Sequence, residues 1–255
     1  MKLHINIRLV FLLYFVHITV HAQVINIEEK RIKNTNDSVH WYGAWQANLN
    51  VSKEKQQIIT FGTDLQLEYK NGKHLVLSLT NLELIKAGNN DLLNNKFQHL
   101  RYNYKWLPRV SSEVFGQVQS NPIQALRSRV LMGFGVRFKA FESKKHKARM
   151  YIGTSLMREK DEYKGFEYKV ENRISIYISM TYEPNAQVSF HSTTYSQPLM
   201  IGLNNTRWFT QNTIDLKINK RLSFNVAYTF RFDPSLPEGI IKQSYRLANG
   251  IKYKF

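Results

Sequence analysis

The chain of 255 residues contains no cysteine. This absence excludes a disulfide framework, a thiolate metal site and a lipidated cysteine at the mature N-terminus. The eight histidines are scattered, without the paired spacing of metal ligands, so we expect no metal and no cofactor. The protein must fold without covalent or metal cross-links.

Acidic residues are few as well. The chain has 19 Asp and Glu against 36 Lys and Arg, which gives a formal net charge of +17. Such an excess can indicate nucleic-acid binding. Here, however, the basic residues alternate with apolar ones along the whole chain, and no recognition motif is present. We therefore expect no nucleic-acid partner.

Long hydrophobic runs are missing after the first 22 residues. Lys2 and Arg8 precede an apolar run of roughly a dozen residues, short of the ~20 that a spanning helix needs. With the small-residue pattern Val20-His21-Ala22, this predicts a secretory signal peptide at 1–22; a membrane anchor is the less favoured alternative. No later stretch approaches a membrane-spanning helix, which agrees with the mean hydropathy of −0.40.

In place of long apolar runs, the chain has segments in which apolar and polar residues alternate with a period of two. In the segments 99–106, 128–140, 172–182 and 222–232, every second residue is aromatic or aliphatic and the residues between are mostly polar or basic. A helix would need apolar residues three and four apart, so these segments are predicted strands. Most of the predicted strands run about 10 to 14 residues, longer than an average globular strand and long enough to cross a bilayer at a tilt.

The connections between strands alternate in character. Tight turns are predicted at 70–73, 107–109, 142–147, 183–185 and 219–221, and Asn71-Gly72 is a type I′ hairpin signal. The connections between them are mostly longer, at 87–94, 120–126, 158–169, 196–205 and 233–242, although the first, near 52–56, is short. Short turns at one end and longer loops at the other are typical of outer-membrane barrels. We expect 158–169 and 196–205 to be exposed to the cell exterior.

The fold prediction is all-β: a transmembrane antiparallel up-and-down β-barrel of about 12 strands, with 10 or 14 as open alternatives. The predicted organisation is a signal peptide at 1–22, an N-terminal periplasmic lead segment at 23–39 and the barrel at 40–255. The signal peptide and the barrel together predict export to a Gram-negative-type outer membrane. The four tryptophans are expected in interfacial girdles: Trp41, Trp45, Trp106 and Trp208.

The chain ends on an alternating strand with a terminal aromatic residue. This end resembles the last strand of outer-membrane proteins, which the barrel-assembly machinery reads as an insertion signal. The matching residues are Tyr245, Leu247, Ile251, Tyr253 and Phe255. Asn249 departs from the pattern, because an apolar residue is expected on that face.

A second resemblance covers 127–255. The Gly133-x-Gly135 of one strand, the "YSQP" at 195–198, the strand "LSFNVAYTFRFD" and the proline-containing last loop resemble the family catalogued as domain of unknown function 481. Its members are described as salt-induced outer-membrane proteins. The resemblance implies a location and a fold, and it implies no chemistry.

Charged residues on the predicted inner face are the candidate functional residues. The basic candidates are Arg101, Arg129, Arg137, Arg149, Arg173, Lys217, Arg231 and Arg246. The acidic candidates are Asp64, Glu68, Glu113 and Asp215. They indicate either an anion-attracting lumen or a plugged small barrel whose charges pair across strands, and we favour the second. Expected partners are outer-membrane lipids, the assembly machinery and small anionic solutes.

Catalysis has weaker support. His191 lies among Ser189 and Thr193, with Asp215 or Glu171 as a candidate orienting acid, but the stretch lacks the His, Ser and Asn spacing of outer-membrane phospholipases. We predict a protein that is not an enzyme: a narrow or plugged channel, or an envelope-maintenance protein linked to osmotic or salt stress. The alternatives are an outer-membrane lipid-modifying hydrolase and a soluble periplasmic β-barrel binding protein.

Overall fold

The computed structural model describes residues 40–53, 57–87, 93–143, 145–203 and 205–254. The predicted signal peptide and lead segment, and the terminal Phe255, lie outside the described residues.

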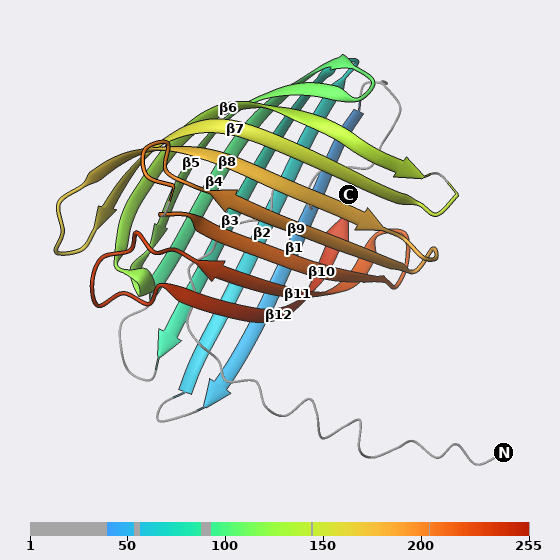
Figure 1. Ribbon diagram of the computed structural model, residues 1–255. Helices are drawn as coiled ribbons and strands as arrows, with labels where there is room; N and C mark the ends of the chain where they lie inside the picture. The colour runs from blue at the N-terminus through green and yellow to red at the C-terminus, as the bar shows by residue number, and fades with distance from the viewer. Residues whose placement is uncertain (1–39, 54–56, 88–92, 144, 204, 255) are drawn as a thin grey trace, which may run out of the picture.

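Within this part of the chain, twelve antiparallel strands form one closed barrel (Figure 1), which confirms the predicted fold class. The elements are β1 (His40–Lys53), β2 (Gln57–Asn71), β3 (His74–Ala87), β4 (Leu93–Leu107), β5 (Val110–Asn121), the 3₁₀ helix η3 (Pro122–Gln124), β6 (Leu126–Ser143), β7 (Ala148–Tyr163), β8 (Lys169–Tyr182), β9 (Val188–Gln197), β10 (Arg207–Lys217), β11 (Leu222–Phe232) and β12 (Gln243–Lys254). None of the helices in the described ranges is long and apolar enough to cross a membrane.

Closure of the barrel explains the alternation at the end of the chain. β12 pairs with β1 in an antiparallel register that sets Tyr253 opposite Trp45 and Ile251 opposite Ala47. Its other edge pairs with β11. Every strand thus has two neighbours, and no open sheet edge is left in an environment without water.

The two ends of the barrel differ. At the end that we call the turn end, tight connections join β2 to β3, β4 to β5, β6 to β7, β8 to β9 and β10 to β11. The turn between β2 and β3 contains Gly72 at a φ of 55°, the left-handed conformation that a type I′ turn requires. The other connections, including 198–206 and 233–242, lie at the opposite end, the loop end.

The connection predicted at 158–169 is shorter than expected. β7 continues to Tyr163 and β8 begins at Lys169, so only 164–168 connects them. The alternation persists through Glu159 and Asp161, which are buried, but their neighbours Arg158, Lys160 and Glu162 on the other face are charged too. A strand that is charged on both faces lacks the apolar signal that would have revealed it.

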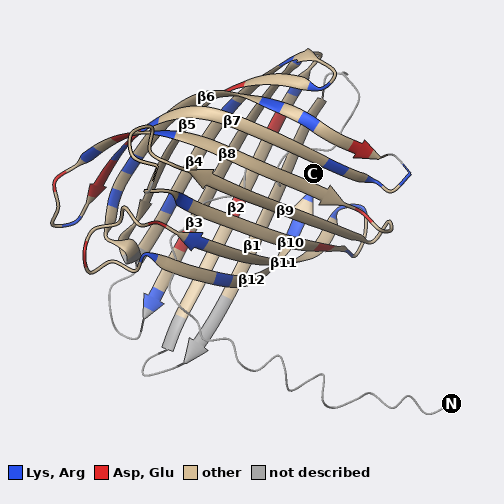
Figure 2. Cartoon of the chain, viewed as in Figure 1, with Lys and Arg blue, Asp and Glu red and all other residues tan. Residues whose placement is uncertain are grey.

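Polarity is inverted relative to a water-soluble protein. On β8, Ile176, Ile178 and Met180 are 41–51% exposed on the outer face, while Arg173 and Ser175 are buried inside. The same alternation recurs in the other strands, and Figure 2 shows charged residues spread over many strands instead of one segment. An apolar exterior around a polar interior is the distribution of a barrel surrounded by lipid.

Candidate functional site

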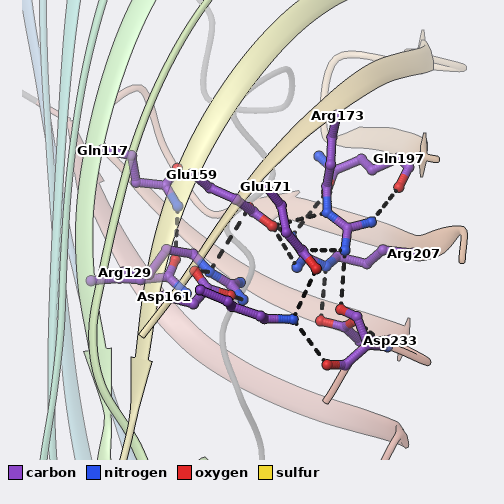
Figure 3. A network of polar contacts seen from close by, with 12 residues as sticks. Gln117, Arg129, Glu159, Asp161, Glu171, Arg173, Gln197, Arg207 and Asp233 are labelled. Atoms are coloured by element: carbon purple, nitrogen blue, oxygen red, sulfur yellow. Dashed lines mark hydrogen bonds and ion pairs between the residues drawn. The ribbon is translucent and has the colours of Figure 1, made fainter. Parts of the chain in front are cut away.

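Ion pairs are concentrated inside the barrel near the loop end (Figure 3). We call this set the loop-end network, and it consists of Arg129, Glu159, Asp161, Glu171, Arg173, Arg207, Arg231 and Asp233. Its members come from β6, β7, β8, β10 and β11 and from the first residue of the loop that follows β11.

Glu159 of β7 is the centre of the network. Its Oε1 accepts hydrogen bonds from Arg173 Nε at 2.9 Å and Arg207 Nη2 at 3.0 Å, and its Oε2 accepts from Arg207 Nη1 at 3.1 Å. Arg129 Nε lies 4.0 Å from Oε2. This carboxylate, 1% exposed, therefore contacts arginines from three other strands.

Asp233 ties the β11–β12 loop (233–242) into the network. Its Oδ2 accepts hydrogen bonds from Arg207 Nε at 2.8 Å and Arg231 Nη2 at 2.9 Å. Ser235 Oγ donates to its Oδ1 at 2.6 Å and accepts from Arg173 Nη2 at 3.0 Å. Burial favours a raised pKa for Asp233, but Arg207 and Arg231 outweigh it and hold that pKa well below its usual range. The loop is held by an ionised group.

Arg129 and its partners lie on β6 and β7, the wall opposite the β11–β12 loop. Arg129 donates from Nε and Nη2 to the two carboxylate oxygens of Asp161, at 2.6 and 2.5 Å, and from Nη2 to Tyr163 Oη at 3.1 Å. The ring of Tyr163 packs with Leu126 of β6 and with Leu236 of the β11–β12 loop. This loop therefore extends from β11 to β6 and β7, which are not its sheet neighbours.

A second loop-end connection, between β5 and β6, reaches toward β11. Gln124 of η3, between β5 and β6, accepts a hydrogen bond from Arg231 Nη1 of β11 at 2.5 Å. Asn121 caps η3 by accepting from the backbone nitrogen of Gln124 at 3.3 Å. Two loop-end connections thus fold inward and meet side chains of the far wall.

The charges of the network balance, and all of its members except Glu171 are buried. Four guanidinium groups face four carboxylates, and Lys169, partly exposed at the rim, adds a contact to Glu171 at 3.2 Å. Charges of this kind are tolerated in a low-dielectric interior only when they are paired and hydrogen-bonded. The interior charges of the network pair across strands.

A small cavity of about 50 Å³ adjoins the network on the side of the turn end. Arg129 and Arg207 of the network border it, and seven strands contribute to its wall. Its lining residues are His99, Arg101, Phe115, Gln117, Gln119, Arg129, Leu131, Ser155, Met157, Ser175, Tyr177, Tyr195, Gln197 and Arg207.

Further charged pairs lie outside the network, two of them in the lumen between arginine and glutamate. Arg101 Nη1 donates to Glu113 Oε2 at 2.6 Å in the cavity wall, and Arg246 Nη2 lies 2.7 Å from Glu83 Oε1, between β12 and β3. Glu83 was not among the predicted residues. Cross-strand pairing is therefore a property of much of the interior.

The structure places the candidate charges predicted from the sequence on the inner face of the wall. They are Arg101, Arg129, Arg137, Arg149, Arg173, Lys217, Arg231, Arg246, Asp64, Glu68, Glu113 and Asp215. Only three of them, Arg129, Arg173 and Arg231, meet in the network. Tyr245, Leu247, Ile251 and Tyr253 of the predicted insertion signal are exposed on the outer face, as are the four tryptophans.

Sequence reasoning missed Glu159, Asp161 and Arg207. The two acids were placed in a loop, and Arg207 begins a strand where the alternation has just started. The period-two spacing of Met157, Glu159 and Asp161 continues the inner face of β7. This spacing is the sequence signal that could have placed the two acids inside the barrel.

His191, weighed as a catalytic base, is buried near the turn end. Its Nδ1 lies 3.1 Å from Thr181 Oγ1, and its Nε2 lies 3.6 Å from Asp215 Oδ2. The hydroxyl of Thr193 donates to Ser179 at 3.0 Å instead of to the imidazole. Glu171, the other candidate acid, belongs to the loop-end network. The contacts of His191 are those of a hydrogen-bonded lining.

Comparisons with solved structures return barrels of similar architecture. A NanC porin matches with a TM-score of 0.50 at 9% identity, covering 83% of this chain and 98% of that chain. The translocator domain of autotransporter NalP from Neisseria meningitidis has a TM-score of 0.44 at 9% identity, with 90% and 92% covered. A KdgM porin has a TM-score of 0.44 at 10% identity, with 85% and 99% covered.

These likenesses concern the fold. No curated protein sequence matches the chain. The family model described as "Protein of unknown function, DUF481" matches residues 31–255. The chain therefore belongs to the DUF481 family.

Proposed function

We propose that the protein is a plugged outer-membrane channel, closed at its loop end by the loop-end network and by the β11–β12 loop. The apolar outer face and the closed ring of strands support a place in lipid. The loop end then faces the cell exterior and the turn end faces the periplasm, as longer loops do in barrels of this class.

One observation carries the proposal: the network and its two inward connections cross the lumen. Glu159 and Asp233 join arginines from separate strands, and Leu236 and Gln124 contact the wall opposite their own anchor points. Removing one member of a buried ion pair commonly costs about 3–5 kcal/mol. Spontaneous opening would break several such pairs at once and is therefore rare.

A closed barrel suits a role in envelope maintenance. It adds a rigid protein to the membrane without letting ions and osmolytes leak through it. We propose that this role matters under osmotic or salt stress. In a deletion strain, growth in high-salt medium should fall more than growth in low-salt medium, and a plasmid copy should restore it. Equal growth of both strains at every salt concentration would refute the stress role.

We also propose that the protein has no enzymatic activity. His191 contacts the hydroxyl of Thr181 and the carboxylate of Asp215, but His191 and Asp215 are buried inside the barrel, away from the lipid at its outer face. His191→Ala should leave lipid turnover in outer-membrane vesicles unchanged. A loss of turnover in this variant would favour the alternative, a lipid-modifying hydrolase.

Liposome swelling tests closure. Proteoliposomes with the wild-type protein should swell little in isotonic solutes, whereas Asp233→Asn should swell faster because the β11–β12 loop loses its charged anchor. The matched control is Glu162→Gln, which breaks the exposed pair between Glu162 and Arg127 (3.0 Å) on the outer face. Equal swelling of wild type and Asp233→Asn would contradict the proposal.

A further inference from the structure

The connections of the turn end carry an excess of exposed basic side chains. They are Lys73, Arg109, Lys145, Lys147, Lys220 and Arg221. The one acid in the described residues of these connections, Glu183, is half-buried. In the described connections of the loop end, the exposed charges cancel, with Lys164 and Lys242 against Glu167 and Glu238. The surplus of positive charge on the barrel surface is thus concentrated at one end.

Three of the turn-end connections are neighbours on the rim. Lys105 N donates to Lys73 O at 2.9 Å, which joins the β2–β3 turn to β4, and Lys139 N donates to Arg109 O at 2.8 Å, which joins the β4–β5 turn to β6. The tip of the β6–β7 hairpin carries Lys and Arg as well (Figure 2). We call the exposed basic residues of these three connections the basic arc: Lys73, Arg109, Lys145 and Lys147. None of the four side chains has an ion-pair partner within the described residues.

Aromatic side chains cover the outer face next to the basic arc. Trp106, 61% exposed, lies three positions before Arg109, and its ring centroid is 4.8 Å from that of Tyr104. His74, which follows Lys73, lies with its ring centroid 5.1 Å from that of Tyr104. Aromatic belts of this kind lie at the depth of the lipid headgroups. The basic arc, on the polar side of the belt, is therefore at the depth of the phosphate groups.

We propose that the basic arc binds the phosphate groups of acidic phospholipids in the leaflet at the turn end. Ammonium and guanidinium groups are common phosphate ligands, and no carboxylate partner competes for those of the arc. A zwitterionic lipid carries its own cation beside the phosphate, so the arc should attract it less strongly than a lipid with a net negative charge.

The aromatic belt favours a lipid over a soluble polyanion as the occupant. It holds the arc at the membrane surface, where phosphate groups are already concentrated. This inference goes beyond the proposed function: it uses the place of the barrel in lipid, and it does not depend on closure of the lumen.

Electron spin resonance of spin-labelled lipids tests the inference. The full barrel is reconstituted in phosphatidylcholine vesicles, and insertion is verified by flotation and by the folded band on an unboiled gel. Phosphatidylglycerol and phosphatidylcholine, each with a nitroxide near the end of one acyl chain, are the probes. The association constant for phosphatidylglycerol should exceed that for phosphatidylcholine at least about twofold. Equal association constants would overturn the inference.

Variants locate the binding. Arg109→Gln combined with Lys145→Gln removes two charges of the arc and should bring the ratio of the two association constants close to one. The control, Lys164→Gln combined with Lys242→Gln, removes the same charge from exposed positions at the loop end and should keep the ratio of the wild type. Equal ratios in the two double variants would place the lipid preference elsewhere and refute the site.

Salt and phosphate test the wild type without a substitution. Between ~0.1 M and ~1 M NaCl the Debye length falls from about 10 Å to about 3 Å, so the ratio should fall toward one. An unchanged ratio would contradict an electrostatic site. Loss of the preference on adding inorganic phosphate at constant ionic strength would assign the arc to soluble phosphate and overturn the lipid assignment. Liposome swelling measures closure separately, so a failure of lipid binding and a failure of the proposed plug are distinguishable.

Discussion

Glu159→Gln is the sharpest perturbation of the loop-end network, because it removes one charge and keeps the shape. In the wild type, Glu159 accepts three hydrogen bonds from Arg173 and Arg207 and lies 4.0 Å from Arg129. The amide of glutamine cannot accept all three, and the buried set is left with one uncompensated positive charge.

The expected loss in the free energy of unfolding follows from the ion pairs that remain in the variant. Breaking a buried ion pair costs about 3–5 kcal/mol. Arg129, Arg173 and Arg207 each keep a second carboxylate, at Asp161, Glu171 and Asp233, so the loss should be near the lower end, about 3 kcal/mol. For the exposed pair that includes Glu162, the corresponding loss in Glu162→Gln is about 0–1 kcal/mol.

The assay is urea unfolding in detergent micelles, followed by the shift between folded and unfolded bands on unboiled gels and by tryptophan fluorescence. A double variant, Glu159→Gln with Arg207→Met, removes both partners and should lose less than the sum of the single losses, because the two residues are coupled. If Glu159→Gln is no more destabilising than Glu162→Gln, the network does not hold the loop end together and the reasoning fails.

Three further predictions follow from the packing and topology. Gly135→Ala should lower the free energy of unfolding by about 1–3 kcal/mol, since a Cβ there overlaps the backbone of β7. Gly116→Ala should not, because a Cβ there meets only Leu131 O at 3.9 Å, an ordinary van der Waals contact. Urea unfolding compares the two variants, and equal stabilities would contradict the packing. The pKa of Asp233 in the folded barrel is far below its value in the unfolded chain. The contribution of Asp233 to closure of the lumen is therefore present above pH ~4 and is lost only as the pH falls toward the depressed pKa. Swelling rates should be equal at pH 7 and pH 5, and faster swelling at pH 5 would contradict this. Because the chain lacks cysteine, Ile201→Cys at the loop end should react with a membrane-impermeant maleimide in intact cells, and Lys220→Cys at the turn end only after permeabilisation; the reverse pattern would invert the proposed orientation.

The strands were predictable where one face is apolar. β11 runs from Leu222 to Phe232, the range that the alternation gives, because its outer face is apolar throughout. β7 was predicted to end near Arg158 because the strand beyond it is charged on both faces, and the hydrophobic signal stops where the network begins. The residues of greatest interest thus lie where the pattern fails.

The partners within the site were not predictable. Gln124 and Arg231 are 107 positions apart, and their contact depends on how the strands tilt and stagger around the barrel. The alternation assigns a residue to the inner face but does not give its height in the lumen. Arg101 and Arg173, both predicted inner residues, therefore belong to different ion-pair groups.

Single-channel recording of the wild-type barrel in a planar bilayer tests the central claim, closure of the lumen, most directly. A protein whose insertion is verified by its folded band on an unboiled gel should show no steady open level, and at most brief rare openings. A stable open level, present in most inserted molecules at neutral pH, would show that the loop-end network leaves a continuous water path and would contradict the account.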